Sequence, residues 1–401
     1  MRSEFITKPL STLADIQTGP FGSQLHKEDY VQNGTPIVTV EHLGKRKFTK
    51  QNLPCVSDED KKRLSKYILH EGDIVFSRVG SVDRCSYVSR EYNGWMFSGR
   101  CLRVRPFAEI EPQYLYYYFT LESTKQFVRG IATGATMPSI NTKFMGEVPI
   151  AYPSIDVQRK IAGLLNTLDD KIELNDAINK NLEQQARALF KSWFLDYEPW
   201  NGSVPDSWNS GKLGDFTEIK RGGSPRPIQE YLSDSGLRWL KISDVTSFQT
   251  PFVIDIKDHI IEAGLRKTVF LKAGSLVLSN SATPGVPKIL DVDSCIHDGW
   301  LYFPESKFSK EYLYLYFKYI RQQLINLSNG SVFNNLKTDI LKGYPTLLPD
   351  KETLRRFDNI VKPMFLQMQT LTRESHKLTD MRDALLPKLM SGELDVSDVE
   401  L

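Results

Sequence analysis

The sequence has few of the residues that hold small disulfide-bonded or metal-binding proteins together. It contains 4 cysteines and 6 histidines among 401 residues, with neither a CxxC pair nor an HExxH motif. Because disulfide frameworks and zinc sites depend on closely spaced cysteine and histidine side chains, neither a disulfide framework nor a metal site is predicted. The cysteines are interpreted as buried structural thiols.

Long apolar runs are also missing. No stretch approaches the roughly 20 apolar residues that span a bilayer, and the N-terminal segment lacks the apolar core of a signal peptide. The 51 Lys and Arg residues nearly balance the 49 Asp and Glu residues, so net charge alone does not point to nucleic acid. We expect a folded, cytoplasmic protein that does not contact a membrane and is long enough for two or three domains.

Motifs for nucleotide hydrolysis and base methylation are absent. No GxxxxGK[ST] loop occurs, and there is no Pro-Pro dipeptide of the kind that holds a flipped base in adenine methyltransferases. Pro205, Asp206, Glu218 and Lys220 satisfy a loose PD…ExK pattern, whose carboxylates would bind a metal in a nuclease. Because this pattern is short and the first half of the chain lacks it, a stand-alone metal-dependent nuclease is only an alternative. No catalytic residue is predicted.

What the sequence does contain is an internal duplication. The matched pairs are Leu10 with Leu213, Gly19 with Gly222, the YLYYYF run at 114–119 with the YLYLYF run at 312–317, and Arg159 with Arg355. The order of the matches is kept along the chain, while their offset falls only from 203 to 196. Each half is therefore predicted to carry the same elements in the same order.

Each half changes character once. Residues 1–153 and 199–349 mix short β-rich runs with turns and one aromatic helix, an α+β pattern, and each segment is interpreted as one domain. At helical spacing, the aromatic runs favour a core-facing stripe over a base-stacking surface. Residues 154–198 and 350–401 are mostly helical and follow a proline. Their first residues, Ser154 and Asp350, are of the types that cap helices.

The helical segments repeat at alternating steps of three and four residues, a coiled-coil heptad. The repeat positions are Ile161, Leu164, Leu168, Lys171, Asn175, Ile178, Leu182, Gln185 and Leu189 in the first helix, and Phe357, Val361, Met364, Met368, Leu371, Ser375, Leu378, Arg382, Leu385 and Leu389 in the second. Polar residues at some of these positions would fix the register. Pro363 is expected to kink the second helix and Pro387 to end it.

Connectivity determines how these helices pair. A helix of about 40 residues rises roughly 60 Å, so the first helix delivers the chain far from the first domain. To bury its seam along the first helix, the second must run back antiparallel to it. The predicted fold class is α+β, with two homologous domains separated by a pair of long antiparallel coiled-coil helices and related by a pseudo-twofold axis.

Two features could contact an anion or a base. Glycine-rich turns occur at matching places, TGPFGSQ at 18–24 and RGGSPRP at 221–227, where backbone N–H groups can approach an anion closely. Arg226 lies between two prolines and could donate to a phosphate or a guanine edge. Basic residues also cluster, as Lys45, Arg46, Lys47 and Lys50, and as Arg100, Arg103 and Arg105. A plain turn, a solvated loop and a strand edge would explain the same residues.

Several segments resemble the helical and loop regions of type I restriction-modification specificity subunits. They are QARALFKSWFLDYEP at 185–199, DALLPKLMSGEL at 383–394, RGGSPRP at 221–227, GDIVFSRVG at 72–80 and PSIDVQRKIA at 153–162. The resemblance spans essentially the whole chain, and internal duplication is typical of that family. It implies target recognition domains at 1–153 and 199–349, a spacer helix at 154–198, and a second spacer helix with a C-terminal tail at 350–401.

The resemblance also implies a function. Such a subunit is noncatalytic, and each recognition domain binds one half of a bipartite, asymmetric site in double-stranded DNA. The helices set the spacer between the half-sites. Two modification subunits carrying S-adenosylmethionine dock on the helices, and restriction subunits that use ATP and magnesium join them, so no cofactor is expected on this chain. A coiled-coil scaffold that never touches nucleic acid is a second alternative.

Residues are assigned to a DNA-contacting surface and to a surface for docking the modification subunits. Those predicted to contact DNA are Gly19, Phe21, Gly22, Ser23, Arg78 and Arg84 in the first domain, and Gly222, Gly223, Ser224, Arg226 and Asn280 in the second. Apolar doublets widen the helix stripe beyond a two-helix seam, which predicts a docking surface. The residues assigned to it are Leu165, Phe190, Trp193, Phe194, Leu386 and Leu389. The alternative is that they pack on the adjoining domain.

Overall fold

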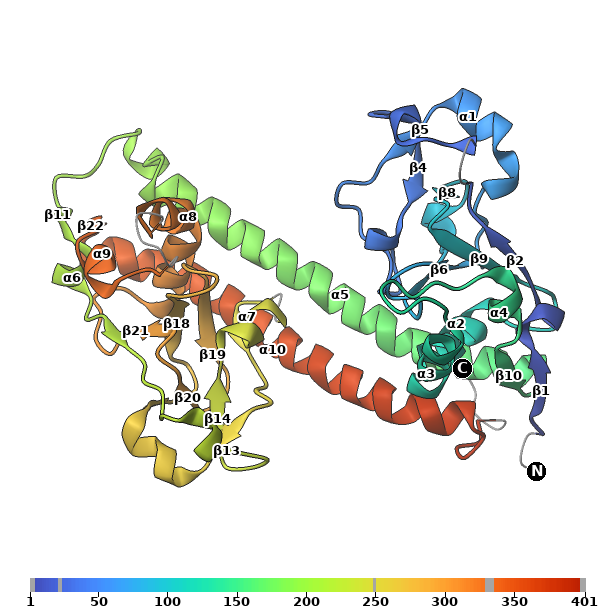
Figure 1. Cartoon of the computed structure of the whole chain (residues 1–401). Coiled ribbons are helices and arrows are strands. Elements are labelled where there is room, and N and C mark those ends of the chain that lie inside the picture. Colours follow the sequence, from blue (N-terminus) through green and yellow to red (C-terminus); the bar gives the residue numbers. More distant parts are fainter. Residues whose placement is uncertain (1–3, 21–23, 248–249, 329–334, 397–401) are drawn as a thin grey trace. The chain divides into compact units, whose positions relative to one another are not determined.

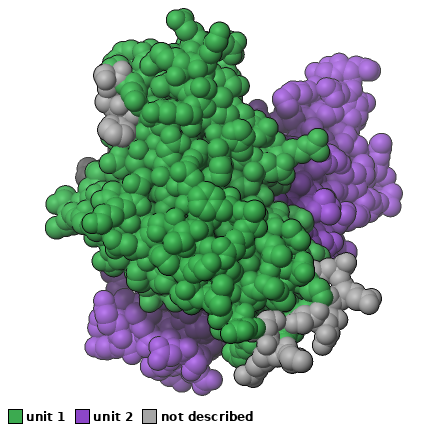
Figure 2. Space-filling view, turned by 90° about the vertical axis from the view of Figure 1, so that its right-hand side faces the viewer, with its two compact units in different colours: residues 1–170, 379–401 green, residues 171–378 purple. Residues whose placement is uncertain are grey.

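The chain forms two compact units. The computed structural model describes residues 4–20, 24–247, 250–328 and 335–396 (Figure 1). One unit contains residues 1–170 and 379–401, and the other contains residues 171–378 (Figure 2). Each unit combines one α+β domain with a segment of both long helices.

The domain of the first unit is built on two small sheets and a terminal ribbon. Its antiparallel sheet has the order β2-β9-β6-β7, and its second sheet has the order β3-β5-β4-β8 with β4 parallel to β8. The ribbon pairs the first strand of the domain, β1, with its last, β10. The strands are β1 Ile6–Pro9, β2 Ala14–Thr18, β3 Tyr30–Val31, β4 Thr35–Val38, β5 Cys55–Val56, β6 Ile74–Ser77, β7 Cys85–Tyr87, β8 Met96–Phe97, β9 Cys101–Pro106 and β10 Pro149–Tyr152.

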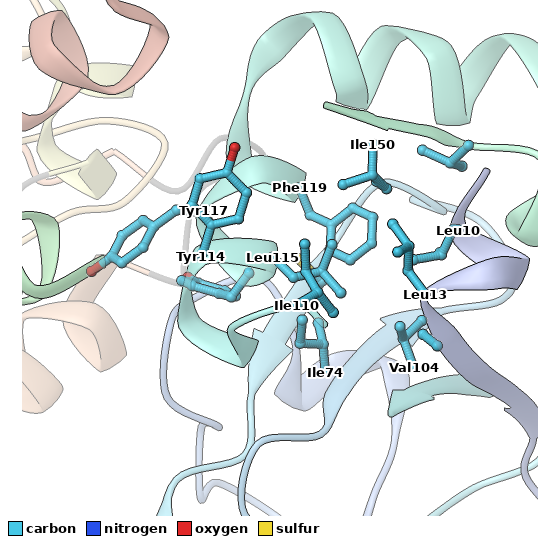
Figure 3. Close-up of a cluster of buried hydrophobic side chains, with 14 of the residues drawn as sticks. Leu10, Leu13, Ile74, Val104, Ile110, Tyr114, Leu115, Tyr117, Phe119 and Ile150 are labelled. Carbon is cyan, nitrogen blue, oxygen red and sulfur yellow. The ribbon is translucent and has the colours of Figure 1, made fainter. Parts of the chain in front are cut away.

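The aromatic run of this domain lies in its core, as the sequence predicts. The helices are α1 Asp58–Arg63, α2 Pro112–Thr120, α3 Glu122–Ile131 and α4 Thr142–Gly146. Pro112 stands in the first turn of α2, where its missing N–H costs no helical hydrogen bond. Tyr114, Leu115 and Phe119 of α2 are at most 1% exposed and pack with residues of the sheet and the ribbon (Figure 3).

The domain of the second unit repeats this plan with one more strand in each sheet. The sheet orders are β12-β21-β18-β19-β15 and β13-β16-β14-β20-β17, and β11 pairs with β22 in the ribbon. The strands are β11 Asn209–Lys212, β12 Lys220–Arg221, β13 Leu232–Ser233, β14 Leu237–Leu240, β15 Phe252–Val253, β16 His259–Ile260, β17 Val269–Leu271, β18 Leu276–Ser279, β19 Pro287–Leu290, β20 Ser294–Ile296, β21 Trp300–Tyr302 and β22 Pro345–Leu348.

The helices of this unit confirm the second aromatic stripe as core. They are α6 Leu213–Phe216, α7 Ile242–Ser247, α8 Lys310–Ser328 and α9 Thr338–Lys342. Tyr312, Leu313 and Phe317 of α8 are buried among residues of the sheet and of the two long helices. In the first domain the equivalent helical stretch is divided between α2 and α3.

Strand register confirms that the halves are duplicates. Ser77 of β6 is opposite Cys101 of β9, and the equivalent Ser279 of β18 is opposite Trp300 of β21. The parallel pairs β4 with β8 and β14 with β20 also correspond. The same ladders therefore form in both domains although their side chains differ.

The long helices are each 40 residues, α5 Ile155–Phe194 and α10 Lys351–Met390. The Asp350 carboxylate accepts a hydrogen bond from the Thr353 backbone N–H at 2.8 Å, as expected of a capping residue. The prediction that Pro387 ends the second helix is wrong, because α10 continues to Met390. Pro387 has no N–H to donate to the carbonyl four residues back, but its own carbonyl accepts from the Ser391 N–H at 3.1 Å, so the helix continues for one more turn.

The two helices are antiparallel within each unit. In the second unit, Asn175 Nδ2 donates to Glu374 Oε2 at 2.8 Å and Asn179 Nδ2 to Thr372 Oγ1 at 3.3 Å, while farther along the ring of Phe194 lies 4.8 Å from that of Phe357. In the first unit, Arg382 Nη1 donates to Asp169 Oδ1 at 2.7 Å, and Ile161 and Leu165 share a core with Leu386 and Leu389. The predicted seam positions are buried or partly buried apart from Lys171 and Gln185, which are exposed. No helix among the described residues is long and apolar enough to cross a membrane.

Candidate nucleic-acid interface

A cleft of about 830 Å³ opens in the domain of the second unit. It is bounded by the turn after β12, the end of β14, the β18–β19 turn and the β20–β21 turn. Pro225, Trp239 and Ile242 contribute apolar surface, and Arg226 and Asp298 contribute charge. The cleft therefore places apolar surface beside hydrogen-bonding groups.

Asp298 is the centre of the polar contacts in this cleft. Ser224 Oγ donates to Asp298 Oδ1 at 2.7 Å, and the Asp298 backbone N–H donates back to Ser224 Oγ at 3.2 Å. Nη2 of Arg226 lies 3.3 Å from Asp298 Oδ2, and Nη2 of Arg221 lies 3.8 Å from the same oxygen. Arg221 Nε also donates to the Asp298 backbone carbonyl. The turn after β12 is thus joined to the β20–β21 turn through one residue.

The ionisation states follow from these contacts. Burial acts to raise the pKa of Asp298, but the Ser224 hydrogen bond and the charges of Arg221 and Arg226, with that of His297 at acidic pH where its ring is protonated, hold that pKa below its ordinary value. Burial lowers the pKa of His297, and the charges of Arg221 and Lys241 add to this effect against the opposing charge of Asp298. Asp298 is therefore negative and His297 neutral at neutral pH.

Those of the predicted glycines that the structure describes serve backbone packing, and their assignment to the DNA contact stays a prediction. A Cβ atom on Gly222 would lie 2.3 Å from the His297 carbonyl oxygen, and one on Gly19 would lie 2.1 Å from that of Ser98, an equivalent position. Their N–H groups donate to backbone carbonyls, as does that of Gly223. These N–H groups are consequently not available to an anion. Phe21, Gly22 and Ser23 lie outside the described residues.

Arg78 and Asn280 occupy equivalent positions and brace equivalent turns. Arg78 Nη1 donates to the Gly99 carbonyl and Asn280 Nδ2 to the Asp298 carbonyl, each at 3.3 Å. The Asn280 side chain is buried, which corrects the prediction that it contacts DNA directly. Arg84 donates to the Leu43 carbonyl from an exposed position. Ser224 and Arg226 are the predicted residues that line the cleft.

Carboxylates of the first unit pair with three arginines of the basic clusters. Arg46 pairs with Asp170. Arg103, which is 3% exposed, pairs with Asp15. Arg105 donates twice to Asp73, each time at 2.7 Å. The strand β9 that carries the last two arginines lies between β2 and β6, so it is not a sheet edge.

Sequence reasoning missed the cleft residues that come from other elements, above all Asp298. A signal was available in the repeat: the second-half strands place Asp298 where the first half has Gly99, in a turn between two matched strands. A turn that changes from glycine to aspartate between otherwise matching domains indicates a difference in surface chemistry.

Both halves of the chain match one family of known proteins. The family model for the type I restriction modification DNA specificity domain matches residues 3–184 and 205–372. The chain belongs to this family. The type I restriction enzyme MjaIX specificity subunit of Methanocaldococcus jannaschii is 23% identical, over 98% of this chain and 94% of that protein. The HindI specificity subunit of Haemophilus influenzae is 24% identical, over 82% and 88% respectively. A crystal structure of a type I restriction-modification S subunit from M. genitalium has the same fold, with a TM-score of 0.65 and 15% identity over 97% of this chain and 96% of that one.

The apolar side chains of the long helices that were expected to dock a partner pack inside the two units instead. Five of the six side chains are buried in the cores of the units: Leu165, Phe190, Phe194, Leu386 and Leu389. The sixth, Trp193, is partly buried against Trp200 and Phe357. Their assignment as an exposed docking surface is therefore wrong, because the adjoining domains and the opposite helix already cover them.

The nuclease alternative gains no support from the fold of this specificity-family chain. Lys220 Nζ is 2.8 Å from Glu218 Oε1, so these two residues form a surface ion pair. Among the described residues, no group of three or more potential metal ligands forms, which leaves Asp206 and Glu218 without such a site. The family match favours a specificity subunit.

Proposed function

We propose that the chain is the sequence-specific DNA-binding subunit of a type I restriction-modification enzyme. The observation that carries this proposal is the specificity-domain match to both halves of a duplicated fold. Each domain reads one half of a bipartite site. The reading turns differ, since the second domain has Arg226 and Asp298 where the first has Ser23 and Gly99, so the half-sites differ and the whole site is asymmetric.

The paired helices set the unread spacer between the half-sites. Two features support a fixed register. Asn175 and Asn179 place amide groups inside the seam and bond across it, and a polar pair at such a position disfavours helix slippage. Each domain is also bonded to a helix of its own unit. In the second unit, Arg373 of α10 donates to both carboxylate oxygens of Asp291 in the domain, at 2.6 and 2.7 Å.

The chain itself is proposed to be noncatalytic. Methylation would be performed by two modification subunits that bring S-adenosylmethionine, and cleavage by restriction subunits that use ATP and magnesium. Support comes from the sequence, which has neither a phosphate-binding loop nor the dipeptide that holds a flipped adenine.

The modification subunits are proposed to dock on the exposed apolar side chains of the helices. In the second unit these are Leu174 of α5 and Ile360 and Leu366 of α10, which are 42 to 64% exposed. Replacing Leu366 with Glu should weaken co-purification of the modification subunit, whereas Gln367→Glu, at the adjacent exposed position, should not. Equal retention by both variants would contradict this docking surface.

Selection from randomised DNA tests the proposed function. The chain, alone and with its modification subunits, is incubated with a pool of randomised duplexes, and the retained DNA is sequenced at several salt concentrations. We expect two short, different motifs separated by a constant gap, with affinity falling as salt rises. A single continuous motif would contradict the two-reader arrangement, and retention that is independent of both sequence and salt would favour the scaffold alternative. Magnesium-dependent cleavage by the chain alone that is lost in Asp206→Ala would favour the nuclease.

A further inference from the structure

The carboxylate of Asp298 in the second domain lies beside two exposed arginines, Arg221 and Arg226. It accepts a hydrogen bond from Ser224 through Oδ1 and faces Arg221 and Arg226 through Oδ2. The Arg226 side chain is 79% exposed, and within the described part of the chain Nη2 is the only guanidinium atom of Arg226 that has a hydrogen-bond partner. One N–H of Nη2 is thus engaged, and the second N–H of Nη2, together with the N–H of its neighbour Nη1 or Nε, is left as a forked edge for a ligand.

We propose that Arg226 reads a guanine in one half-site and that Asp298 is the positioning residue that holds the Arg226 guanidinium for this contact. This inference rests on the proposed function and names the base that the second domain recognises. Arg226 would donate two hydrogen bonds to N7 and O6 of guanine in the major groove, the pairing that matches the forked geometry of arginine.

The local charge favours a base edge over a phosphate. Asp298 stays ionised beside Arg226, so a phosphate on this guanidinium would lie near a negative carboxylate. Guanine N7 and O6 are neutral acceptors and avoid that repulsion. Fixing one end of a long side chain also lowers the conformational entropy lost when it binds, which benefits a contact that depends on direction more than one that depends on charge alone.

The backbone supports the same arrangement. Pro225 and Pro227 flank Arg226 and restrict its main chain, and the preceding Ser224 is bonded to Asp298 in both directions. Arg226 is therefore constrained on the main-chain side and through its guanidinium. The first domain has Ser23 and Gly99 at the matching positions, so it has no such pair. The effect should be confined to one half-site.

The test compares base preference for variants of the full chain in complex with its modification subunits. The duplexes carry the selected site with each of the four base pairs placed in turn at every position of both half-sites. The variants are Arg226→Ala, Arg226→Lys, Asp298→Asn and the double variant Arg226→Ala with Asp298→Asn. Asp293→Asn is the matched control, because Asp293 is 40% exposed beside Lys272 and Asp298 is 38% exposed beside its arginines.

Arg226→Ala should reduce preference for guanine at one position by roughly 5- to 150-fold and leave the other half-site unchanged. Arg226→Lys should lose that preference while keeping its salt dependence, since it keeps the charge but not the fork. Asp298→Asn should weaken the same preference, and the double variant should be no worse than Arg226→Ala alone, because a positioning residue has no effect once the residue it holds is gone. The control should match the wild type.

Three results would overturn the inference. Loss that is uniform across all bases, with a salt dependence lowered by about one charge, would assign Arg226 to a phosphate. An effect of Asp298→Asn that persists in the Arg226→Ala background would show that Asp298 acts by another route. Unchanged guanine preference in Arg226→Lys would show that no forked arginine contact reads the base. This result is decisive even if the Asp298→Asn variant does not fold. If the wild-type complex selects no split motif, the proposed function fails first, which is a distinct outcome.

Discussion

Replacing Gly222 with alanine tests whether close backbone approach shapes the turn that carries Arg226. The new Cβ would lie 2.3 Å from the His297 carbonyl oxygen and 2.9 Å from that of Ile296. Since Cβ atoms essentially never lie within 3.0 Å of a neighbouring heavy atom, the two backbone segments must separate by at least about 0.7 Å. Both partners are backbone atoms, so no side-chain rotation can relieve the contact.

This separation should lower the free energy of unfolding of the second domain. The Gly222 N–H donates to the Trp300 carbonyl at 2.8 Å, and the same turn bonds Ser224 to Asp298. Overpacking of this kind costs about 1 to 3 kcal/mol. For a domain of this size it should lower the melting temperature by roughly 2 to 12 °C. Gly19→Ala should behave alike in the first domain, because its Cβ would lie 2.1 Å from the Ser98 carbonyl oxygen.

Differential scanning calorimetry of the full chain measures this effect, with Gly130→Ala as the control. Gly130 lies in α3, and no atom lies within 4 Å of its added Cβ. Alanine at this helical position should leave stability unchanged or raise it by up to about 1 kcal/mol. Melting temperatures for Gly222→Ala as high as those for Gly130→Ala would refute the reasoning.

Two further predictions concern stability. Ala282 has a φ of 57° and the equivalent Gly80 a φ of 74°, a backbone conformation that favours glycine. Ala282→Gly should therefore raise the free energy of unfolding and Gly80→Ala should lower it, each by about 0.5 to 1 kcal/mol in urea denaturation. A change of the same sign in both variants would contradict a backbone origin. Burial lowers the pKa of Lys288 from 10.5 to about 8, with the charge of Lys318 adding to the effect. Between these two pH values the unfolded chain binds more protons, so stability should rise from about pH 8 to 10.5, and Lys288→Met should remove that part of the rise. Identical pH profiles for wild type and Lys288→Met would contradict this assignment.

The arrangement of elements was predictable because it depends on patterns repeated in the sequence. The aromatic runs around Tyr114 and Tyr312 lie in the cores, and the helices begin one residue after Ser154 and Asp350. Heptad spacing identified the seam but not how far the apolar surface is covered. Phe190 and Phe194 looked like surface for a partner because the sequence does not reveal that α8 and α10 pack on them.

The site was less predictable, since it depends on distant turns meeting. Arg226 was identified from its own neighbours, Pro225 and Pro227. Its carboxylate partner, Asp298, lies 72 residues away, and only the pairing of β12 with β21 brings the two together. Gly222 shows what the sequence could not reveal: the β20–β21 turn leaves no room for a side chain at this position, so its glycine has a packing reason whether or not the turn contacts an anion.

The ribbons β1–β10 and β11–β22 join the place where the chain enters each domain to the place where it leaves. Ile6 is opposite Tyr152 in one, and Asn209 is opposite Leu348 in the other. Everything between the two ribbon strands consequently leaves the chain and returns to it at a single base, from which the following helix starts. A segment of different length and surface could replace the present one if it kept this base and the contacts with the helices, such as that of Asp291 with Arg373. New target preferences could then arise by replacement of a whole module as well as by point substitution.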